Sequence, residues 1–231
     1  MDGKAVIVTG AFGVLGAAVA KAFAAAGARV ALVDRVEAPP AGLMETLGAD
    51  AVALGGVDLT DPGQAKAVVA DVVARFGRLD ALVNVAGGFR WETHAEGSPD
   101  TWELLWALNV RTCANMCRAA VADLAASGDG RIVNVGAGGA VKAGAGMGAY
   151  AATKAGVHRL TEALAEEQKG KVTVNAVLPS IIDTPTNRAD MPKADVSAWV
   201  APADLAQVIL FLTSPPARAI TGALIPVSGR V

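Results

Sequence analysis

The sequence predicts an α/β fold: a single doubly wound domain with a seven-stranded parallel sheet and helices on both faces. Short β-branched runs alternate with Ala-rich helical stretches at intervals of roughly thirty residues, the pattern of repeated strand–helix–strand units. The composition is rich in Ala, Val and Gly and poor in aromatic residues, which suits a buried sheet between closely packed helices. We therefore expect one nucleotide-binding Rossmann domain over residues 1–231.

The strands are predicted from short apolar runs in which β-branched residues dominate. Such runs, when nearly continuous, are typical of strands buried on both faces of a parallel sheet. The predicted strands span residues 4–9, 29–33, 51–57, 79–83, 131–135, 171–178 and 223–227.

The helices are predicted from the Ala-rich segments between these runs, and glycine or proline marks several of their ends. Gly27 and Gly77 follow the first and third helices, where a left-handed residue is favoured, and Pro62 and Pro202 stand near helix starts. The predicted helices span residues 17–26, 43–47, 62–76, 99–107, 109–126, 150–168 and 202–213.

A glycine-rich turn joins the first strand to the first helix. Glycines let the backbone approach a pyrophosphate, and the helix N-terminus offers free N–H groups and partial positive charge. The alternative is a tight turn with no ligand. The strand before and the helix after the turn favour a dinucleotide site that contains Gly10, Phe12, Gly13, Val14, Leu15 and Gly16.

Two carboxylates follow the next two strands. Asp34 lies about twenty residues beyond the turn, where a carboxylate accepts hydrogen bonds from ribose hydroxyls and repels a 2′-phosphate. This favours NAD(H), and Arg35 leaves NADP(H) open because an arginine can pair with a phosphate. Asp58, followed by Leu59, is placed either to bind the adenine amino group or to cap the helix that begins near Asp61.

Small residues follow the strand at 79–83. They leave room for a ligand at the crevice where such sheets bind cofactors, so Asn84, Ala86 and Gly87 are predicted cofactor contacts. Phe89 and Trp91 come next along the chain. Large aromatic residues here either floor a pocket for a flat substrate or pack within the loop.

Tyr150, the only tyrosine in the chain, stands four residues before Lys154 on a predicted helix. This spacing puts the two side chains on one helix face. An ammonium beside a phenol favours the phenolate and lowers a pKa that starts near ~10, which makes the hydroxyl a proton donor or acceptor near neutral pH. The alternative is a helix face with a solvated lysine.

A long irregular stretch follows the sixth strand. A connection of this length is typical of a substrate lid, which we expect at about residues 180–200. Ser180, Ile182 and Thr184 lie in its first part.

Composition argues against several other classes of protein. The net charge is −2, which suggests neither a nucleic-acid partner nor an anionic membrane surface. Cys113 and Cys117 lack the further ligands of a metal site, so we expect two buried thiols and no metal. No apolar run reaches the length of a signal peptide or a membrane span, and we expect a cytoplasmic protein.

In order and spacing, these motifs resemble the short-chain dehydrogenase/reductase family over essentially the whole chain. The residues that carry the resemblance are Thr9-Gly10, Gly13, Gly16, Asp34, Asp58, Asn84-Val85-Ala86-Gly87, Asn109, Tyr150, Lys154 and Pro179 to Thr184.

This resemblance implies roles for individual residues. Tyr150 is the catalytic acid/base, and Lys154 holds the nicotinamide ribose and lowers the tyrosine pKa. Asn109 anchors a water molecule of the proton relay, and Thr184 meets the nicotinamide carboxamide, with Pro179 and Ile182 in the same cofactor-binding segment. The resemblance also implies a homodimer or homotetramer built on the helices that start at Asn109 and Tyr150.

Two positions depart from the family pattern. The middle glycine is Gly13, where the commoner pattern has it at Val14, and the catalytic serine position, thirteen residues before Tyr150, holds Ala137. A serine there donates a hydrogen bond to the carbonyl oxygen, and removing such a donor costs ~10²–10³ in rate. Ser180 and Thr186 can replace it only if the lid folds inward.

At both of these positions, and in its lid residues, the chain resembles dihydropteridine reductase, an NADH-dependent member of the family. A quinonoid pterin takes hydride into a conjugated ring, so one proton donor suffices. Phe89 stands where that enzyme has a tryptophan, whereas Asn109 is a residue that it lacks. We therefore expect reduction of a quinonoid dihydropterin or another conjugated small molecule. An ordinary ketone or alcohol is the first alternative, and a catalytically silent dinucleotide-binding sensor is the second.

Overall fold

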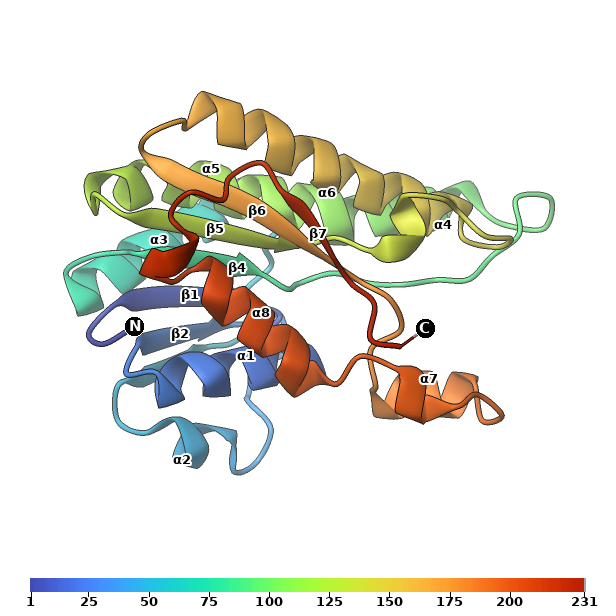
Figure 1. Ribbon diagram of the computed structural model, residues 1–231, viewed down its shortest axis with the longest axis horizontal. Helices are drawn as coiled ribbons and strands as arrows, with labels where there is room; N and C mark the ends of the chain where they lie inside the picture. The colour runs from blue at the N-terminus through green and yellow to red at the C-terminus, as the bar shows by residue number, and fades with distance from the viewer. Residues whose placement is uncertain (231) are drawn as a thin grey trace.

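The computed structural model describes residues 1–230, and its seven parallel strands form one sheet in the order β3-β2-β1-β4-β5-β6-β7 (Figure 1). The fold class expected from the sequence is confirmed. The strands are β1 (Ala5–Thr9), β2 (Arg29–Val33), β3 (Ala51–Leu54), β4 (Ala81–Asn84), β5 (Gly130–Val135), β6 (Val172–Pro179) and β7 (Leu224–Val227).

The helices follow the predicted order with small shifts at their ends. The first helix begins at Val14 rather than at residue 17, because the end of the glycine turn already forms its first turn. The α-helices are α1 (Val14–Ala25), α2 (Leu43–Leu47), α3 (Pro62–Phe76), α4 (Pro99–Leu105), α5 (Thr112–Ala126), α6 (Gly148–Glu167), α7 (Pro185–Asp190) and α8 (Pro202–Leu212). Short 3₁₀ turns are η2 (Gly138–Ala140), η3 (Val196–Ala198) and η4 (Pro215–Ala217).

Side chains alternate across the strands and fill two cores. Val6 and Val8 of β1 pack in the core beneath α1 and α8, whereas Ile7 packs in the core beneath α3, α5 and α6 (Figure 1). Both faces of the sheet are therefore covered by helices, which explains why the strands read as continuous apolar runs.

The strand order reverses between β1 and β4, which are neighbours in the sheet although β2 and β3 come between them in the sequence. Such a reversal leaves a crevice outside the carboxyl ends of the two strands, where ligands of open α/β sheets bind. The turns after β1 and β4 both open into this crevice.

An ion cluster around the buried Asp80 ties the opposite end of the sheet together. Asp80, just before β4, accepts hydrogen bonds from the backbone N–H of Ala5 (2.9 Å), from Lys4 Nζ (3.1 Å) and from Arg78 Nη2 (2.6 Å). Burial opposes ionisation of this carboxyl, but the bonds from Arg78, Ala5 and Lys4 outweigh it and hold the Asp80 pKa below its usual value.

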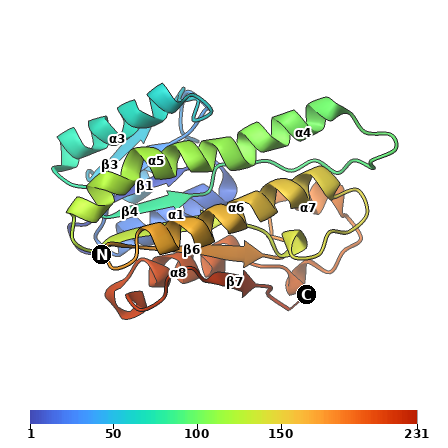
Figure 2. The same cartoon turned by 90° about the horizontal axis from the view of Figure 1, so that it is seen from above.

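The region around Asn109 differs from the prediction. Instead of two helices, α4 continues through a π-helical segment, η1 (Trp106–Arg111), directly into α5. Asn109 therefore lies inside a continuous helical run and does not begin a helix. The π segment has no marker such as glycine or proline, so periodicity alone could not locate it. Figure 2 shows α4 and the start of α6 extending together beyond the carboxyl ends of the strands.

The predicted lid contains more regular structure than expected. It includes α7 and η3, and a parallel bridge joins Ile182 to Val200. Arg188 binds the carboxylate of Asp183 through Nε (2.6 Å) and Nη2 (2.8 Å). No helix within residues 1–230 combines the length and the apolar character needed to cross a bilayer.

Candidate functional site

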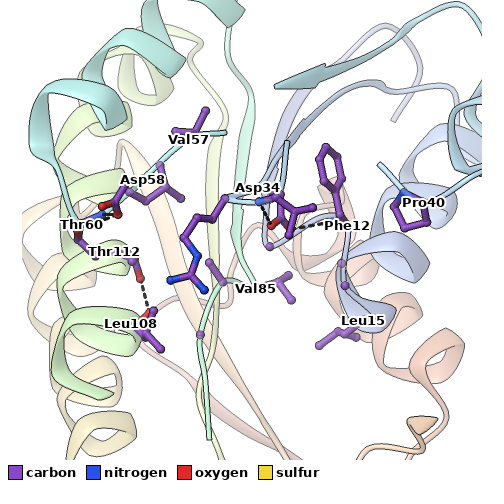
Figure 3. A pocket seen from close by; sticks show the side chains of 18 of the residues that line it. Phe12, Leu15, Asp34, Pro40, Val57, Asp58, Thr60, Val85, Leu108 and Thr112 are labelled. Carbon is purple, nitrogen blue, oxygen red and sulfur yellow. Dashed lines mark hydrogen bonds between the residues drawn. The ribbon is translucent and has the colours of Figure 1, made fainter. Parts of the chain in front are cut away.

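A cleft of about 540 Å³ opens at the carboxyl ends of β1, β2 and β4 (Figure 3). Most of the predicted residues of the glycine turn and of the two acidic positions line it. Its walls comprise Gly10, Phe12, Gly13, Leu15, Gly16, Asp34, Arg35, Val36, Ala38, Pro40, Val57, Asp58, Leu59, Thr60, Val85, Ala86, Gly87, Leu108 and Thr112.

The glycine turn brings backbone, rather than side chains, to the floor of the cleft. Gly10 has φ +62°, and a Cβ at this position would lie 2.8 Å from the backbone of Ala86 in the turn after β4. No side chain caps the start of α1 at Gly13, so its free N–H groups lie at the cleft. This cradle fits a pyrophosphate. Val14 points elsewhere: it is 46 % exposed and does not line the cleft.

Asp34 is fixed by the backbone around it. One carboxylate oxygen accepts the N–H of Phe12 (2.9 Å) and the other accepts the N–H of Val36 (3.1 Å). In Figure 3 the carboxylate lies between the glycine turn and the opposite wall of the cleft. Each oxygen keeps a further lone pair, so the group can still accept ribose hydroxyls. Arg35 lines the cleft beside it.

The capping role that the sequence left open for Asp58 belongs to Asp61. Asp61 is the N-cap of α3 and accepts from the N–H of Gly63 (2.6 Å). Asp58 lines the cleft instead and accepts from Thr60 through Oγ1 (2.8 Å) and N–H (2.9 Å). The hydrogen bonds from Thr60 hold the Asp58 pKa below its usual value, so this carboxylate is charged at neutral pH.

Asn84 turns away from the cleft. Its amide nitrogen donates to Asn134 Oδ1 (2.9 Å) and contacts Cys117 Sγ (3.4 Å) in the core. Asn134 in turn donates to Thr161 Oγ1 (2.9 Å) and accepts from Cys113 Sγ (3.4 Å). The two cysteines are free and buried, as expected from the sequence. The side chain of Asn84 therefore lies in the core, and the turn after β4 is held instead by Thr9, whose Oγ1 accepts the N–H groups of Val85 (3.1 Å) and Ala86 (3.1 Å).

Lys154 is buried at the carboxyl end of β5. Its Nζ donates to the carbonyl of Val135 (2.8 Å) and lies 3.2 Å from where a Cβ of Gly87 would be, which puts the ammonium just behind the cleft wall. Burial lowers the Lys154 pKa to about 8.

Tyr150 lies one turn earlier on α6, with the ring of Phe89 packed edge-on against it at a centroid distance of 4.9 Å. Burial raises the Tyr150 pKa to about 12. The expectation that the neighbouring ammonium lowers this pKa is therefore wrong for the chain alone: the cost of burying a phenolate dominates. Tyr150 is a protonated hydroxyl at neutral pH.

Asn109 fixes the loop that follows the turn after β4. Its Oδ1 accepts the N–H of Gly88 (2.9 Å), and its Nδ2 donates to the Gly88 carbonyl (3.1 Å) and to Thr153 Oγ1 (3.0 Å). Thr153 in turn donates to the carbonyl of Tyr150 (2.9 Å). The Asn109 side chain thus links the loop before Phe89 to the first turn of α6.

The remaining predicted residues surround this region. Ala137 is buried just after β5, in extended conformation. Ser180 donates to the carbonyl of Ser228 (2.8 Å), so its hydroxyl is held toward the carboxyl-terminal segment. Thr184 caps α7 by accepting from the N–H of Asn187 (3.2 Å), and Asn187 also binds the Ile182 carbonyl (2.7 Å).

A second hollow of about 610 Å³ lies between the loops that precede α4 and α6. The two loops are joined by Trp91, whose Nε1 donates to the Ala145 carbonyl (3.0 Å), and by the N–H of Glu92, which donates to the Gly146 carbonyl (2.8 Å). Trp91 therefore packs within the loops, although it is 62 % exposed.

Sequence reasoning missed several residues of the cleft, which include Leu108 and Thr112. Both come from the helical run around Asn109, and they reach the cleft because α5 packs beside β4. Their spacing in the sequence indicates this position: Thr112 is four residues after Leu108 and three after Asn109, which puts the three side chains on one side of a helix.

Known proteins resemble this chain throughout its length. A family model described as short chain dehydrogenase matches residues 4–195. D-threitol dehydrogenase of Mycolicibacterium smegmatis is 34 % identical, covering 99 % of this chain and 93 % of its own. Galactitol 2-dehydrogenase (L-tagatose-forming) of Cereibacter sphaeroides is also 34 % identical, and the match covers 99 % of this chain and 95 % of that protein. The crystal structure of 3-ketoacyl-(acyl-carrier-protein) reductase from Brucella melitensis complexed with NADH is 31 % identical, with a TM-score of 0.88 and coverage of 99 % and 98 %.

Proposed function

The chain belongs to the short chain dehydrogenases, and on that premise we propose that it is an NAD(H)-dependent oxidoreductase that interconverts a small alcohol and its ketone. One observation carries the proposal: the buried Lys154 ammonium, one helical turn from Tyr150, lies against Gly87 at the edge of the cleft. A lysine whose pKa is lowered by burial and that lies at the edge of a cleft is a candidate for a functional role.

The cleft supports a nicotinamide dinucleotide as cofactor. The backbone cradle at Gly10 would hold the pyrophosphate, Asp34 the adenosine ribose and Asp58 the adenine. The fixed Asp34 carboxylate disfavours a 2′-phosphate, so we propose NAD(H), and Arg35 leaves NADP(H) open. The relative from Brucella melitensis is described with NADH, which supports the same cofactor class. The bound nicotinamide supplies or takes the hydride.

Tyr150 is proposed as the proton donor in reduction and the acceptor in oxidation. With its pKa raised to about 12, the hydroxyl carries its proton at neutral pH and can donate to an oxygen that gains negative charge. Lys154 would stabilise the phenolate left behind and hold the nicotinamide ribose. Asn109 would keep the loop at Gly88 and the first turn of α6 in register, and its proposed water would extend the proton path.

The relatives described above support the alcohol–ketone assignment, because two of them are named as dehydrogenases of polyols, D-threitol and galactitol. The quinonoid dihydropterin expected from the sequence has no such support. A conjugated acceptor remains the second candidate because one observation favours it: Ala137 offers no hydroxyl to a carbonyl oxygen. Phe89, in contact with Tyr150 and 53 % exposed, presents a ring to such a substrate.

A homodimer or homotetramer, built on the long helices that contain Asn109 and Tyr150, is part of the proposal, as is a cytoplasmic location. Trp102 and Trp106 support association because they are 41 % and 47 % exposed on the helical run of α4 and η1. Mass photometry of the purified chain tests the oligomer.

The test of function follows NADH and NADPH absorbance with D-threitol, galactitol, small ketones and a quinonoid dihydropterin. We expect turnover with at least one alcohol–ketone pair and loss of turnover in Tyr150→Phe. NADH affinity should stay within about twofold of wild type, because the substitution removes only the hydroxyl and keeps the aromatic ring. Full activity of Tyr150→Phe would remove Tyr150 from the mechanism. Absence of turnover in the wild type would favour the silent sensor.

A further inference from the structure

The imidazole of His158 lies beneath the loop that leads from β5 toward α6. His158 is on α6, one turn after Lys154, and is only 2 % exposed. Its Nε2 accepts the backbone N–H of Ala137 at 3.3 Å. A Cβ on Gly136 would lie 2.5 Å from Nε2 and 2.7 Å from Cδ2 of the same ring. The ring therefore occupies the space that a side chain at position 136 would need.

Helix α6 holds this loop at two points on either side of Gly136. Lys154 donates to the carbonyl of Val135 (2.8 Å), and His158 accepts from the N–H of Ala137 (3.3 Å). Gly136 itself donates to the carbonyl of Val177 on β6 (2.9 Å). The backbone around position 137 is thus fixed from α6 and from the sheet.

His158 can accept this bond only while Nε2 carries no proton, which assigns the ring proton to Nδ1. Burial, then Arg159 and Lys154, lower the His158 pKa, and Glu162 opposes them. These three charged groups are all on α6, and the residues of the β5 loop that lie next to the ring, Gly136 and Ala137, carry no charge. Protonation would remove the acceptor and add a second cation beside Lys154.

We propose that His158 is a positioning residue for the reaction, matched to Gly136, that fixes the backbone at Ala137 by acting as a neutral hydrogen-bond acceptor. The proposal rests on the function proposed above. Because position 137 has no hydroxyl, it can meet a substrate only with its backbone and its methyl group. Where that backbone lies is then set by the imidazole behind it.

Two sets of variants test the pairing. His158→Leu keeps much of the volume and removes the acceptor, whereas His158→Gln places an amide oxygen near the position of Nε2. Gly136→Ala should be destabilising because the new methyl group meets the ring, and His158→Ala should relieve that cost in the double variant. A purely local space-filling role predicts the stability coupling without any difference in rate between the Leu and Gln variants.

The rate is measured with the alcohol–ketone pair that the wild type turns over, from pH 5 to pH 8. We expect His158→Leu to lower kcat roughly 10- to 100-fold while NADH affinity stays within about twofold, because a misplaced wall affects chemistry more than cofactor binding. Wild-type activity should fall toward acid pH, because Nε2 then gains a proton and no longer accepts the N–H of Ala137. His158→Gln should recover most of the rate and should lack this fall. Equal rates and equal pH profiles for wild type and His158→Leu would overturn the proposal.

Nitrogen-15 NMR of the histidine rings gives a readout that needs no substrate. The chain has two histidines, so the exposed His94 serves as internal reference. We expect His158 to show an unprotonated Nε2 at pH 7 and to titrate below the usual pKa of a histidine. A protonated Nε2 at pH 7 would refute the inference even if the enzyme is active, whereas absence of turnover in the wild type would refute only the proposed function.

Discussion

Replacing Lys154 by Met is expected to make the protein more stable and less active. The lysine is buried, and burial lowers its pKa from 10.5 to about 8. At about 1.36 kcal/mol for each pKa unit, the folded chain below pH 8 holds the ammonium at a cost of about 3 kcal/mol relative to the unfolded chain. Methionine fills a similar volume without charge.

The substitution also leaves the Val135 carbonyl without its 2.8 Å partner, which costs about 1–3 kcal/mol. The net gain in unfolding free energy at pH 7 is therefore about 0–2 kcal/mol. For a chain of this size, about 2–4 °C in Tm corresponds to each kcal/mol, so the melting temperature should rise by up to roughly 8 °C. NADH oxidation by the same variant should be lost.

The pH dependence gives the sharper test. Between about pH 8 and 10.5 the unfolded chain still binds the lysine proton that the folded chain has released, so wild-type stability gains a rising contribution from Lys154 as pH increases. Lys154→Met lacks this contribution, so the amount by which its unfolding free energy exceeds that of the wild type should shrink toward pH 10.5. Urea denaturation at pH 7, 8.5 and 10 measures both chains, with the exposed Lys66→Met as matched control. A Lys154→Met chain that is less stable than wild type at pH 7, or an advantage that persists at pH 10, would refute the reasoning.

Three further predictions concern activity. Asp34→Asn keeps the acceptor for the N–H of Phe12 but removes the charge that disfavours a 2′-phosphate. The ratio of kcat/KM for NADPH to that for NADH should therefore rise at least about tenfold. An unchanged ratio would show that the charge does not select the cofactor. The rate of reduction should fall as pH rises above about 8, because Lys154 then loses the proton that stabilises the phenolate, and a flat profile to pH 9.5 contradicts this role. Ala137→Ser should raise ketone reduction roughly 10-fold or more by adding a donor to the carbonyl oxygen, and quinonoid dihydropterin reduction should not change.

The parts of the fold and site that the sequence predicts well are local. The turn at Gly10 and the acidic residue Asp34 each follow a strand, and neighbouring parallel strands end at the same edge of the sheet, so they meet in one cleft. The continuous helix through Asn109 was not predictable, because a π segment needs no special residue.

The effects of side-chain burial could not be predicted either. The spacing of Tyr150 and Lys154 correctly puts both on α6, but which force dominates their pKa values depends on burial, which the sequence does not give. In the same way, no carboxylate or metal-ligand pattern surrounds His158 in the sequence, and only the path of the β5 loop brings Ala137 to its ring. Asn84 is the reverse case: its position along the chain is right for the cleft, but its side chain points into the core.

The Asp80 cluster and the cleft lie at opposite ends of the same strands. Lys4, Arg78 and Ala5 surround Asp80 where β1 and β4 begin, whereas the cleft lies at the carboxyl ends of the strands. Segments at the carboxyl ends of the strands can therefore be exchanged without disturbing the Asp80 contacts at their amino ends. Grafting a related enzyme's connection between β6 and α8 onto this scaffold should change which compound is accepted while the chimera still folds.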